Sequence, residues 1–284
     1  MSLIIEPKTK DIGFPVRRLL PARECQRVGP FIFVDHMGPA KFAKDSTEGD
    51  VRQHPHIGLA TVTYLFTGAM MHRDSLGIEQ RIEPGAINLM TSGSGIVHSE
   101  RMPSDVRDAE VDVQGIQTWL ALPIEQEEIA PSFDHYPAEK IPSASISGGS
   151  VRVLIGELEG LKSPVVTHSA TSYFEVKLDA DSEYQIEVSG HELSVYLASG
   201  RVQVNGENLS ENQLLVSVDK INLRTGNAAC HALILGGEQL EGKRYLHWNF
   251  VSSRMERIRQ ASDDWENKRF TLVPGETEFI PLPK

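Results

Sequence analysis

Residues 54–65 read HPHIGLATVTYL and combine a pair of histidines with the start of a long β-rich run. The run continues as VTYLFTG and ends at Gly68. Further along the chain, other short β-rich runs are broken by Gly, Pro, Asn or Asp, including AINLMTSG at 86–93 and GIQTWLALP at 115–123. Strands of this length and spacing predict an all-β chain built from antiparallel sandwiches or barrels.

A short internal echo indicates two copies of one fold. The pattern Tyr-Leu-x-x-Gly at 64–68 recurs at 196–200, which is 132 positions later, and each copy follows a Val-rich strand. The length of 284 residues agrees, because a domain takes about 150 residues. In the second copy, Asn205-Gly206 is a strong hairpin signal between two strands. We therefore expect two antiparallel β-barrels in tandem.

The segment from Pro123 to Ser150, between the two copies, has the composition of a linker. It is rich in proline, contains the acidic run EQEE at 125–128, and ends in SGGS at 147–150. We interpret the acidic run as a solvated surface. The predicted organisation is an N-terminal barrel at 1–135, a linker at 136–150 and a C-terminal barrel with a final helix at 151–284.

The final helix is predicted from a change of period near the C-terminus. Ser253 and Glu256 have the spacing of a capping box, in which each side chain bonds the backbone of the other residue. Met255, Ile258 and Trp265 follow on one helical face. These residues predict a helix of about four turns.

Composition and charge exclude several classes of function. Lys and Arg total 28 and Asp and Glu total 39, for a net charge of −11, which argues against direct nucleic-acid binding. Cys25 and Cys230 form no CxxC pair, so neither a thiolate zinc site nor a disulfide framework is predicted. The first apolar run is too short for a signal peptide or a membrane span. We expect a cytoplasmic protein with no membrane partner.

Two His-containing pairs in the N-terminal barrel predict a metal site. In a strand, residues two apart point to the same face, so His54 and His56 lie together, as do His98 and Glu100. Two such strands can meet around one ion. Nitrogen and oxygen ligands without thiolate favour Fe, Mn, Ni, Cu or Zn over a structural tetrahedral zinc. Six-coordination would leave two positions open.

The histidines also have a simpler interpretation. A lone His-x-His pair is more often a surface or packing feature, but Pro55 restricts its conformations and the second pair supports a shared site. His72 could face the same cavity, although a hydrogen-bonded strand-end residue is the simpler interpretation. In the second copy, Ile186 and Val188 occupy the positions of the first pair, so that barrel is expected to hold no metal.

The segments HPHIGLATVTYL, PGAINLMTSGSGIVHSE and GIQTWLALP resemble the N-terminal cupin domain of the pirin family, and GPFIFVDHMGP at 29–39 extends the resemblance. The resemblance implies two tandem cupin barrels of the double-stranded β-helix, or jelly-roll, type. It also implies one metal ion per chain, usually iron, with His54, His56, His98 and Glu100 as ligands. One departure from the general cupin pattern is Ala60, where a glutamate is often found.

The pirin family includes bacterial enzymes that cleave flavonols, so the resemblance implies a 2,3-dioxygenase acting on a small aromatic substrate such as quercetin with O2. A flavonol that chelates the metal would lose its hydroxyl proton more easily, and Glu100 would be the catalytic base that accepts it. Fe(II) is the expected metal, with Mn, Ni, Cu or Zn as alternatives.

The alternative is a metal-dependent or redox-dependent regulatory protein that binds a protein partner and turns over no substrate. Pirins are also described in such roles, and the acidic balance suits a partner with a basic face. Access to the metal separates the two hypotheses, because an enzyme needs room for a three-ring substrate.

Overall fold

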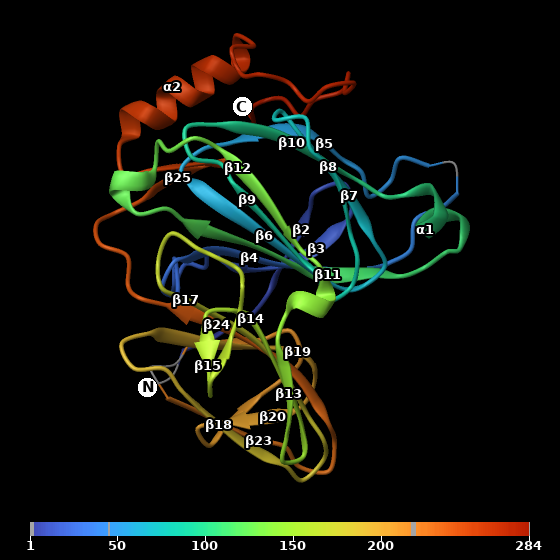
Figure 1. The fold of residues 1–284 in the computed structure, drawn as a ribbon, viewed down its shortest axis with the longest axis vertical. Coiled ribbons are helices and arrows are strands. Elements are labelled where there is room, and N and C mark those ends of the chain that lie inside the picture. The colour runs from blue at the N-terminus through green and yellow to red at the C-terminus, as the bar shows by residue number, and fades with distance from the viewer. Residues whose placement is uncertain (1–2, 45, 217–219, 284) are drawn as a thin grey trace. The chain divides into compact units, whose positions relative to one another are not determined.

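The computed structural model describes residues 3–44, 46–216 and 220–283 and consists mainly of antiparallel strands (Figure 1). The chain forms two compact units, and neither is a single continuous stretch of sequence. Unit 1 comprises Met1–Thr9, Arg17–Asp35 and Glu139–Leu240, and unit 2 comprises Lys10–Val16, His36–Ala138 and Glu241–Lys284. No helix in these described ranges is long and apolar enough to cross a membrane.

Unit 2 is built around two antiparallel sheets. One has the order β12-β9-β6-β11-β4-β3-β2, and the other has the order β5-β10-β7-β8. Residues of both sheets, including Leu65, Met70 and Ile82, meet in a buried apolar cluster. The elements are β2 Lys8–Asp11, β3 Pro15–Leu20, β4 Phe31–Ala40, β5 Val51–His56, β6 Leu59–Thr67, β7 Met70–Asp74, β8 Glu79–Ile82, β9 Ile87–Thr91, β10 Ile96–Arg101, α1 Ser104–Asp108, β11 Val113–Ala121, η1 Ile124–Gln126, β12 Ser132–Tyr136, β25 Tyr245–His247, β26 Phe250–Ser252 and α2 Met255–Glu266.

Unit 1 has the same design. Its sheets have the orders β1-β22-β19-β24-β17-β14-β13 and β18-β23-β20-β21, and Phe174 of the first packs with Ile221 of the second in one core. The elements are β1 Leu3–Ile5, η2 Ala138–Lys140, β13 Ser143–Ile146, β14 Gly149–Ile155, β15 Glu157–Leu158, β16 Leu161–Lys162, β17 Thr171–Leu178, β18 Glu183–Glu187, β19 Glu192–Gly200, β20 Val202–Val204, β21 Glu207–Leu209, β22 Leu214–Val216, β23 Lys220–Arg224 and β24 Cys230–Gly237.

The predicted internal echo marks equivalent strands of the two units. The first copy of Tyr-Leu-x-x-Gly ends β6, which lies between β9 and β11, and the second ends β19, which lies between β22 and β24. The Asn205-Gly206 hairpin is also confirmed, because both residues have positive φ and they join the paired strands β20 and β21. The all-β prediction of two barrels with a C-terminal helix is confirmed.

The observed division of the chain differs from the predicted contiguous domains 1–135 and 151–284. The segment after Leu240, predicted to belong to the second domain, clusters in unit 2. The reason is apolar packing, since Ile258 and Trp265 of α2 share a buried cluster with Ile57 and Val97. Conversely, residues 17–35, predicted to belong to the first domain, cluster in unit 1. Strands β3 and β4 are therefore divided between the units, after residue 16 and after residue 35.

The predicted linker at 136–150 contains regular structure, namely the short helix η2 and the strands of a β-hairpin. β13 pairs with β14 as a hairpin, in register from Ser143 opposite Arg152 to Ile146 opposite Gly149. Gly148 has a φ of +68°, a conformation that favours glycine in the tight turn. The Ser-Gly-Gly-Ser signal therefore marked a turn rather than a flexible connection.

Helix α2 begins differently from the prediction, and a buried carboxylate supports the segment before it. The residue that precedes the helix is Arg254, and no side chain caps the helix there, so the Ser253–Glu256 capping box is wrong. Ser253 instead donates its backbone N–H and its hydroxyl to Glu127. Glu127 also accepts the Ser252 hydroxyl at 3.0 Å and pairs with Arg244 at 2.9 Å.

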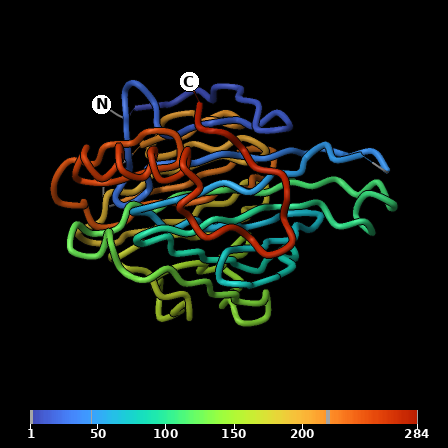
Figure 2. The backbone as a smooth tube through the Cα atoms, turned by 90° about the horizontal axis from the view of Figure 1, so that it is seen from above, coloured from blue at the N-terminus to red at the C-terminus, as the bar shows by residue number. Residues whose placement is uncertain are grey.

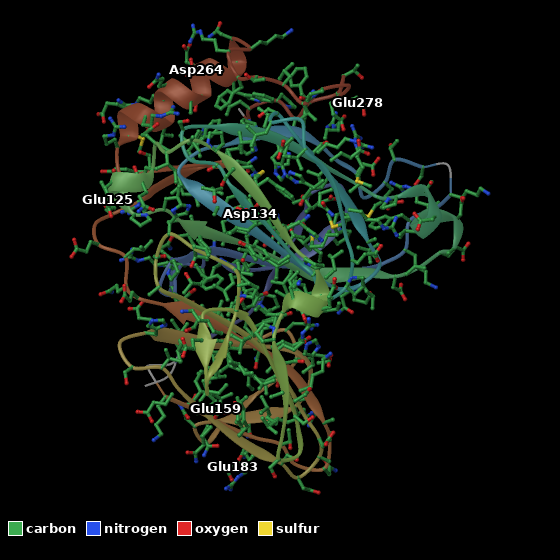
Figure 3. The ribbon with its side chains drawn as sticks, viewed as in Figure 1. Glu125, Asp134, Glu159, Glu183, Asp264 and Glu278 are labelled. Atoms are coloured by element: carbon green, nitrogen blue, oxygen red, sulfur yellow. The ribbon has the colours of Figure 1, made fainter. Side chains whose placement is uncertain are left out.

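This carboxylate corrects the interpretation of the acidic run as a solvated surface. Glu127 is only 3% exposed, whereas Glu125, which is labelled in Figure 3, is exposed. Burying a carboxylate is costly unless it is paired and hydrogen-bonded, and Glu127 meets both conditions.

The C-terminal tail after α2 runs beside β5, where Phe279 forms a bridge with Gln53, and it is the red tube that follows the helix in Figure 2. Gln53 accepts the Val273 N–H and donates to the carbonyl of Glu276, and the carbonyl of Gln53 accepts the Ile280 N–H. The carboxylate of Glu276 accepts the Ser99 hydroxyl at 2.8 Å and pairs with Arg101. The tail therefore supports both strands from behind.

We predict that Glu127→Ala lowers the free energy of unfolding of unit 2 by about 3 kcal/mol, because it leaves the buried Arg244 guanidinium without its carboxylate. Glu128→Ala is the control and should cost less than about 1 kcal/mol, because Glu128 is exposed in its pairs with Arg254 and Arg257. Urea unfolding followed by tryptophan fluorescence reports unit 2, since all three tryptophans lie in it. Equal losses from the two variants would contradict the prediction.

Candidate metal centre

Three of the four predicted ligands converge between the sheets of unit 2. The imidazoles of His54, His56 and His98 each offer a nitrogen, and these atoms all lie within 4.8 Å of one another. The Nε2 atoms of His56 and His98 are 3.1 Å apart. The ring centroids of the three side chains are separated by 4.5–5.0 Å. All three side chains are buried, and His54 retains the most exposure at 6%.

Strand pairing explains this convergence. β5 and β10 are antiparallel neighbours, with His98 directly opposite His54 and Ile96 opposite His56. Because side chains alternate between the two faces of a strand, both histidines of β5 point to the same side as His98. Ile57 and Val97 point to the other side, where they pack beneath α2, so these two apolar residues do not line the cavity.

The hydrogen bond of His54 fixes the form of its ring. His54 Nδ1 lies 2.8 Å from the carbonyl oxygen of Arg52. A carbonyl can only accept, so Nδ1 carries the hydrogen and Nε2 keeps its lone pair. That is the form in which a histidine binds a metal, and a backbone carbonyl is a usual partner for the other nitrogen.

Burial keeps all three imidazoles neutral. It lowers the pKa of His54 to about 4, against a smaller opposing effect of the Arg52 carbonyl. Burial and the neighbouring histidines also lower the pKa values of His56 and His98 well below the ordinary range. At neutral pH no proton competes with a cation for these nitrogens. The donor set therefore fits a divalent transition metal.

Glu100, the fourth predicted ligand, lies two residues beyond His98, after a register shift in the pairing of β10 with β5. Its carboxylate is not part of the group of three nitrogens within 4.8 Å. Burial raises the pKa of Glu100 to about 7. Gln117 of β11 donates to Glu100 Oε1 at 3.4 Å and accepts the Thr63 hydroxyl at 2.7 Å. The opposite sheet thus positions the carboxylate.

Several neighbours of the site were missed or set aside at the sequence level. The rings of Trp119 and His56 form a T-shaped pair with their centroids 5.1 Å apart. The rings of Phe133 and His72 are stacked, with their centroids 4.3 Å apart. His72 Nδ1 lies 3.4 Å from His98 Nδ1, so this histidine does face the site. Its spacing to Asp74 repeats the i, i+2 pattern of the ligand pairs, and that signal could have identified it.

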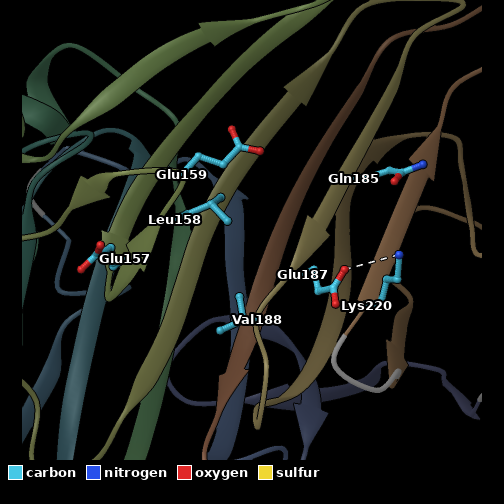
Figure 4. Close-up of a pocket in the computed structure, with 7 residues that line it drawn as sticks. All are labelled: Glu157, Leu158, Glu159, Gln185, Glu187, Val188 and Lys220. Atoms are coloured by element: carbon cyan, nitrogen blue, oxygen red, sulfur yellow. Dashed lines mark ion pairs between the residues drawn. The ribbon is translucent and has the colours of Figure 1, made fainter.

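The equivalent region of unit 1 holds apolar side chains, as predicted. Ile186 is buried in the core and Val188 packs against it. Val188 also lines a pocket of about 530 Å³ in this unit, shown in Figure 4, where Glu187 pairs with Lys220 at 3.4 Å. In the same unit, His231 bonds the buried Glu175 at 2.8 Å.

Two antiparallel barrels in one chain, one of them with three histidines converging between its sheets, define a bicupin of the metal-binding type. The family model described as Pirin matches residues 13–120, and the model described as the Pirin C-terminal cupin domain matches residues 173–271. The chain belongs to the pirin family.

Comparison with individual proteins agrees. A pirin-like protein of Caulobacter vibrioides is 42% identical over the full length of both chains. The crystal structure of a quercetin 2,3-dioxygenase from Acinetobacter baumannii superposes with a TM-score of 0.91 at 32% identity, covering 100% of this chain and 95% of the other. The Escherichia coli pirin YhhW, solved in complex with nickel(II), matches with a TM-score of 0.66 at 15% identity, covering 84% of this chain and 100% of the other.

We predict that His54→Ala reduces metal content at least about tenfold, because it removes one of three converging nitrogens. The measurement is metal analysis of protein purified without a chelator or an affinity tag. His135→Ala is the control, since His135 bonds Asn88 in the same unit and is not one of the three histidines. Full occupancy in His54→Ala would rule out the ligand assignment.

Proposed function

We propose that the chain holds one divalent transition metal, with Glu100 as the fourth ligand beside the three histidines. Three neutral imidazoles and one carboxylate would leave a net charge of about +1 on a divalent ion. Fe(II) is our first choice, and the same donors accept Mn, Ni, Cu or Zn. The coordinated nickel in YhhW supports a metal in this fold.

We further propose that the protein is a dioxygenase that opens a flavonol such as quercetin with O2. The observation that carries this proposal is the neutral, buried histidine triad in a chain whose fold closely matches a quercetin 2,3-dioxygenase. The bound metal would supply a positive charge that polarises the chelating oxygens of the substrate, and a redox couple for O2.

Glu100 is the residue that would accept the flavonol hydroxyl proton. In the metal-free protein, burial raises the pKa of Glu100 to about 7, so this carboxylate takes up a proton more readily than an exposed one. The Gln117 amide donates to Glu100 Oε1 at 3.4 Å and so helps to fix the orientation of the carboxylate. Trp119 and Phe133 provide aromatic surface beside the histidines, suited to a planar substrate.

We also propose a cytoplasmic location. Both cysteines, Cys25 and Cys230, are free thiols in the structure, and burial raises the pKa of each. A reducing compartment would keep these thiols free and would also keep iron in the Fe(II) state.

If Glu100 is a ligand, metal binding must displace its proton. With a pKa of about 7, the metal-free carboxyl is mostly protonated at pH 6 and mostly ionised at pH 8, so proton release on binding falls from nearly one to nearly none across this range. Calorimetry in buffers of different ionisation enthalpy measures the release. Glu100→Gln should release no proton at pH 6, and release equal to that of the unaltered protein would show that Glu100 is not a ligand.

Anaerobic loading with Fe(II), followed by addition of O2 and quercetin, tests the proposed reaction. We expect loss of the quercetin absorbance with release of CO, dependent on the metal and at least about a hundredfold slower in Glu100→Gln. A metal-loaded protein that turns over no flavonol across a panel would reject the dioxygenase. That outcome would favour the regulatory protein that binds a partner.

A further inference from the structure

A chain of hydrogen bonds leads away from the metal centre through His98. On the side away from His56, His98 Nδ1 lies 3.4 Å from Nδ1 of His72. His72 Nε2 in turn lies 3.1 Å from Asp74 Oδ2. His72 is 6% exposed, and Asp74 is completely buried. The three residues come from the neighbouring strands β7 and β10, which hold them in register with His98 opposite Asp74.

The direction of these bonds follows from what each atom can do. Asp74 Oδ2 is an acceptor, so His72 Nε2 carries a hydrogen and donates it. In the neutral form of His72, Nδ1 has a lone pair, and His98 then donates its own Nδ1–H to it. His98 Nε2 is left with its lone pair, and this is the atom that faces His56 Nε2. This series of hydrogen bonds thus selects the tautomer in which Nε2 of His98 is free to bind a metal.

Asp74 is itself held in one orientation. Its other oxygen, Oδ1, accepts the backbone N–H groups of Leu76 at 2.9 Å and Ile78 at 3.1 Å. The ring of Phe133 stacks on His72 with an interplanar angle of 20° and limits its rotation. His72 and Asp74 are therefore both held in place by the fold.

We propose that His72 and Asp74 are positioning residues that fix the tautomer of His98 for metal binding. The inference rests on the proposed metal site, but not on the identity of the substrate. A backbone carbonyl fixes the tautomer of His54. The tautomer of His98 depends instead on two side chains, His72 and the carboxylate of Asp74. Such outer partners typically contribute a factor of about 10 to 100 to metal affinity.

Asp74→Asn is a sharp test because it reverses the donor–acceptor direction of these hydrogen bonds and leaves the shape of the side chain almost unchanged. The amide oxygen of the new residue is retained by the Leu76 and Ile78 N–H groups, so its NH2 group faces His72 Nε2. His72 must then donate from Nδ1, and His98 must accept at Nδ1 and carry its hydrogen on Nε2. The nitrogen that should bind the metal becomes a donor.

The first readout is the ¹⁵N spectrum of histidine-labelled, metal-free full-length protein, with His98 assigned from a His98→Gln variant. We expect Nδ1 to be the protonated nitrogen of His98 in the unaltered protein and Nε2 in Asp74→Asn. The second readout is Ni(II) affinity in competition with a chelator, which should fall about 10- to 100-fold in Asp74→Asn and in His72→Phe. Glu175→Gln is the matched control, because it changes the carboxylate beside His231 in unit 1 and should alter neither readout.

The outcomes separate this inference from the proposed function. If the unaltered protein binds Ni(II) but Asp74→Asn keeps the same His98 tautomer and the same affinity, the positioning role is wrong and the metal site stands. If the unaltered protein binds no Ni(II), the metal site itself fails. Loss of flavonol turnover alone would not test the positioning role of His72 or of Asp74.

Discussion

The antiparallel pairing of β5 with β10 is the constraint on which the rest of the site depends. It sets His98 opposite His54 and brings three imidazoles together in the interior of one barrel. A shift of one residue in this register would turn His98 to the opposite face of its strand. Three neutral imidazoles with nitrogens directed at one another cannot all be satisfied by hydrogen bonds among themselves, whereas a single cation would satisfy all three.

The opposite face of the same two strands explains why the C-terminal segment clusters with unit 2. Gln53 and Ser99 alternate with the histidines and point outward, where the tail bonds both of them. Ile57 and Val97 are covered by α2. Strands β5 and β10 are thus held from inside by Gln117 and His72, and from outside by a segment more than 150 residues away in sequence.

Local sequence patterns correctly predicted local features of the structure. Strand alternation predicted the face on which His54 and His98 lie, and the Asn205-Gly206 turn was found because only a few residues permit its conformation. Features that arise from distant contacts were not predictable in this way. Glu127 lies in an acidic run that resembles a solvated surface, and its burial depends on Arg244 and the serines before α2. The tail over β5 was missed for the same reason.

Within the site, the sequence could indicate ligand types but not their roles. Glu100 matches the ligand pattern, yet its position relative to the histidines depends on a local register shift in β10. The His72–Asp74 pair has the same spacing as the predicted ligand pairs, and only the structure shows that His72 contacts Nδ1 of His98 and is not among the three histidines that converge.

X-ray absorption spectroscopy of the protein loaded anaerobically with one equivalent of Fe(II) tests the central claim most directly. The outer-shell scattering of imidazole rings counts the histidines bound to iron. Our account predicts three imidazoles, with the remaining donors oxygen. A spectrum with fewer than three imidazoles, or with a sulfur donor, would contradict it.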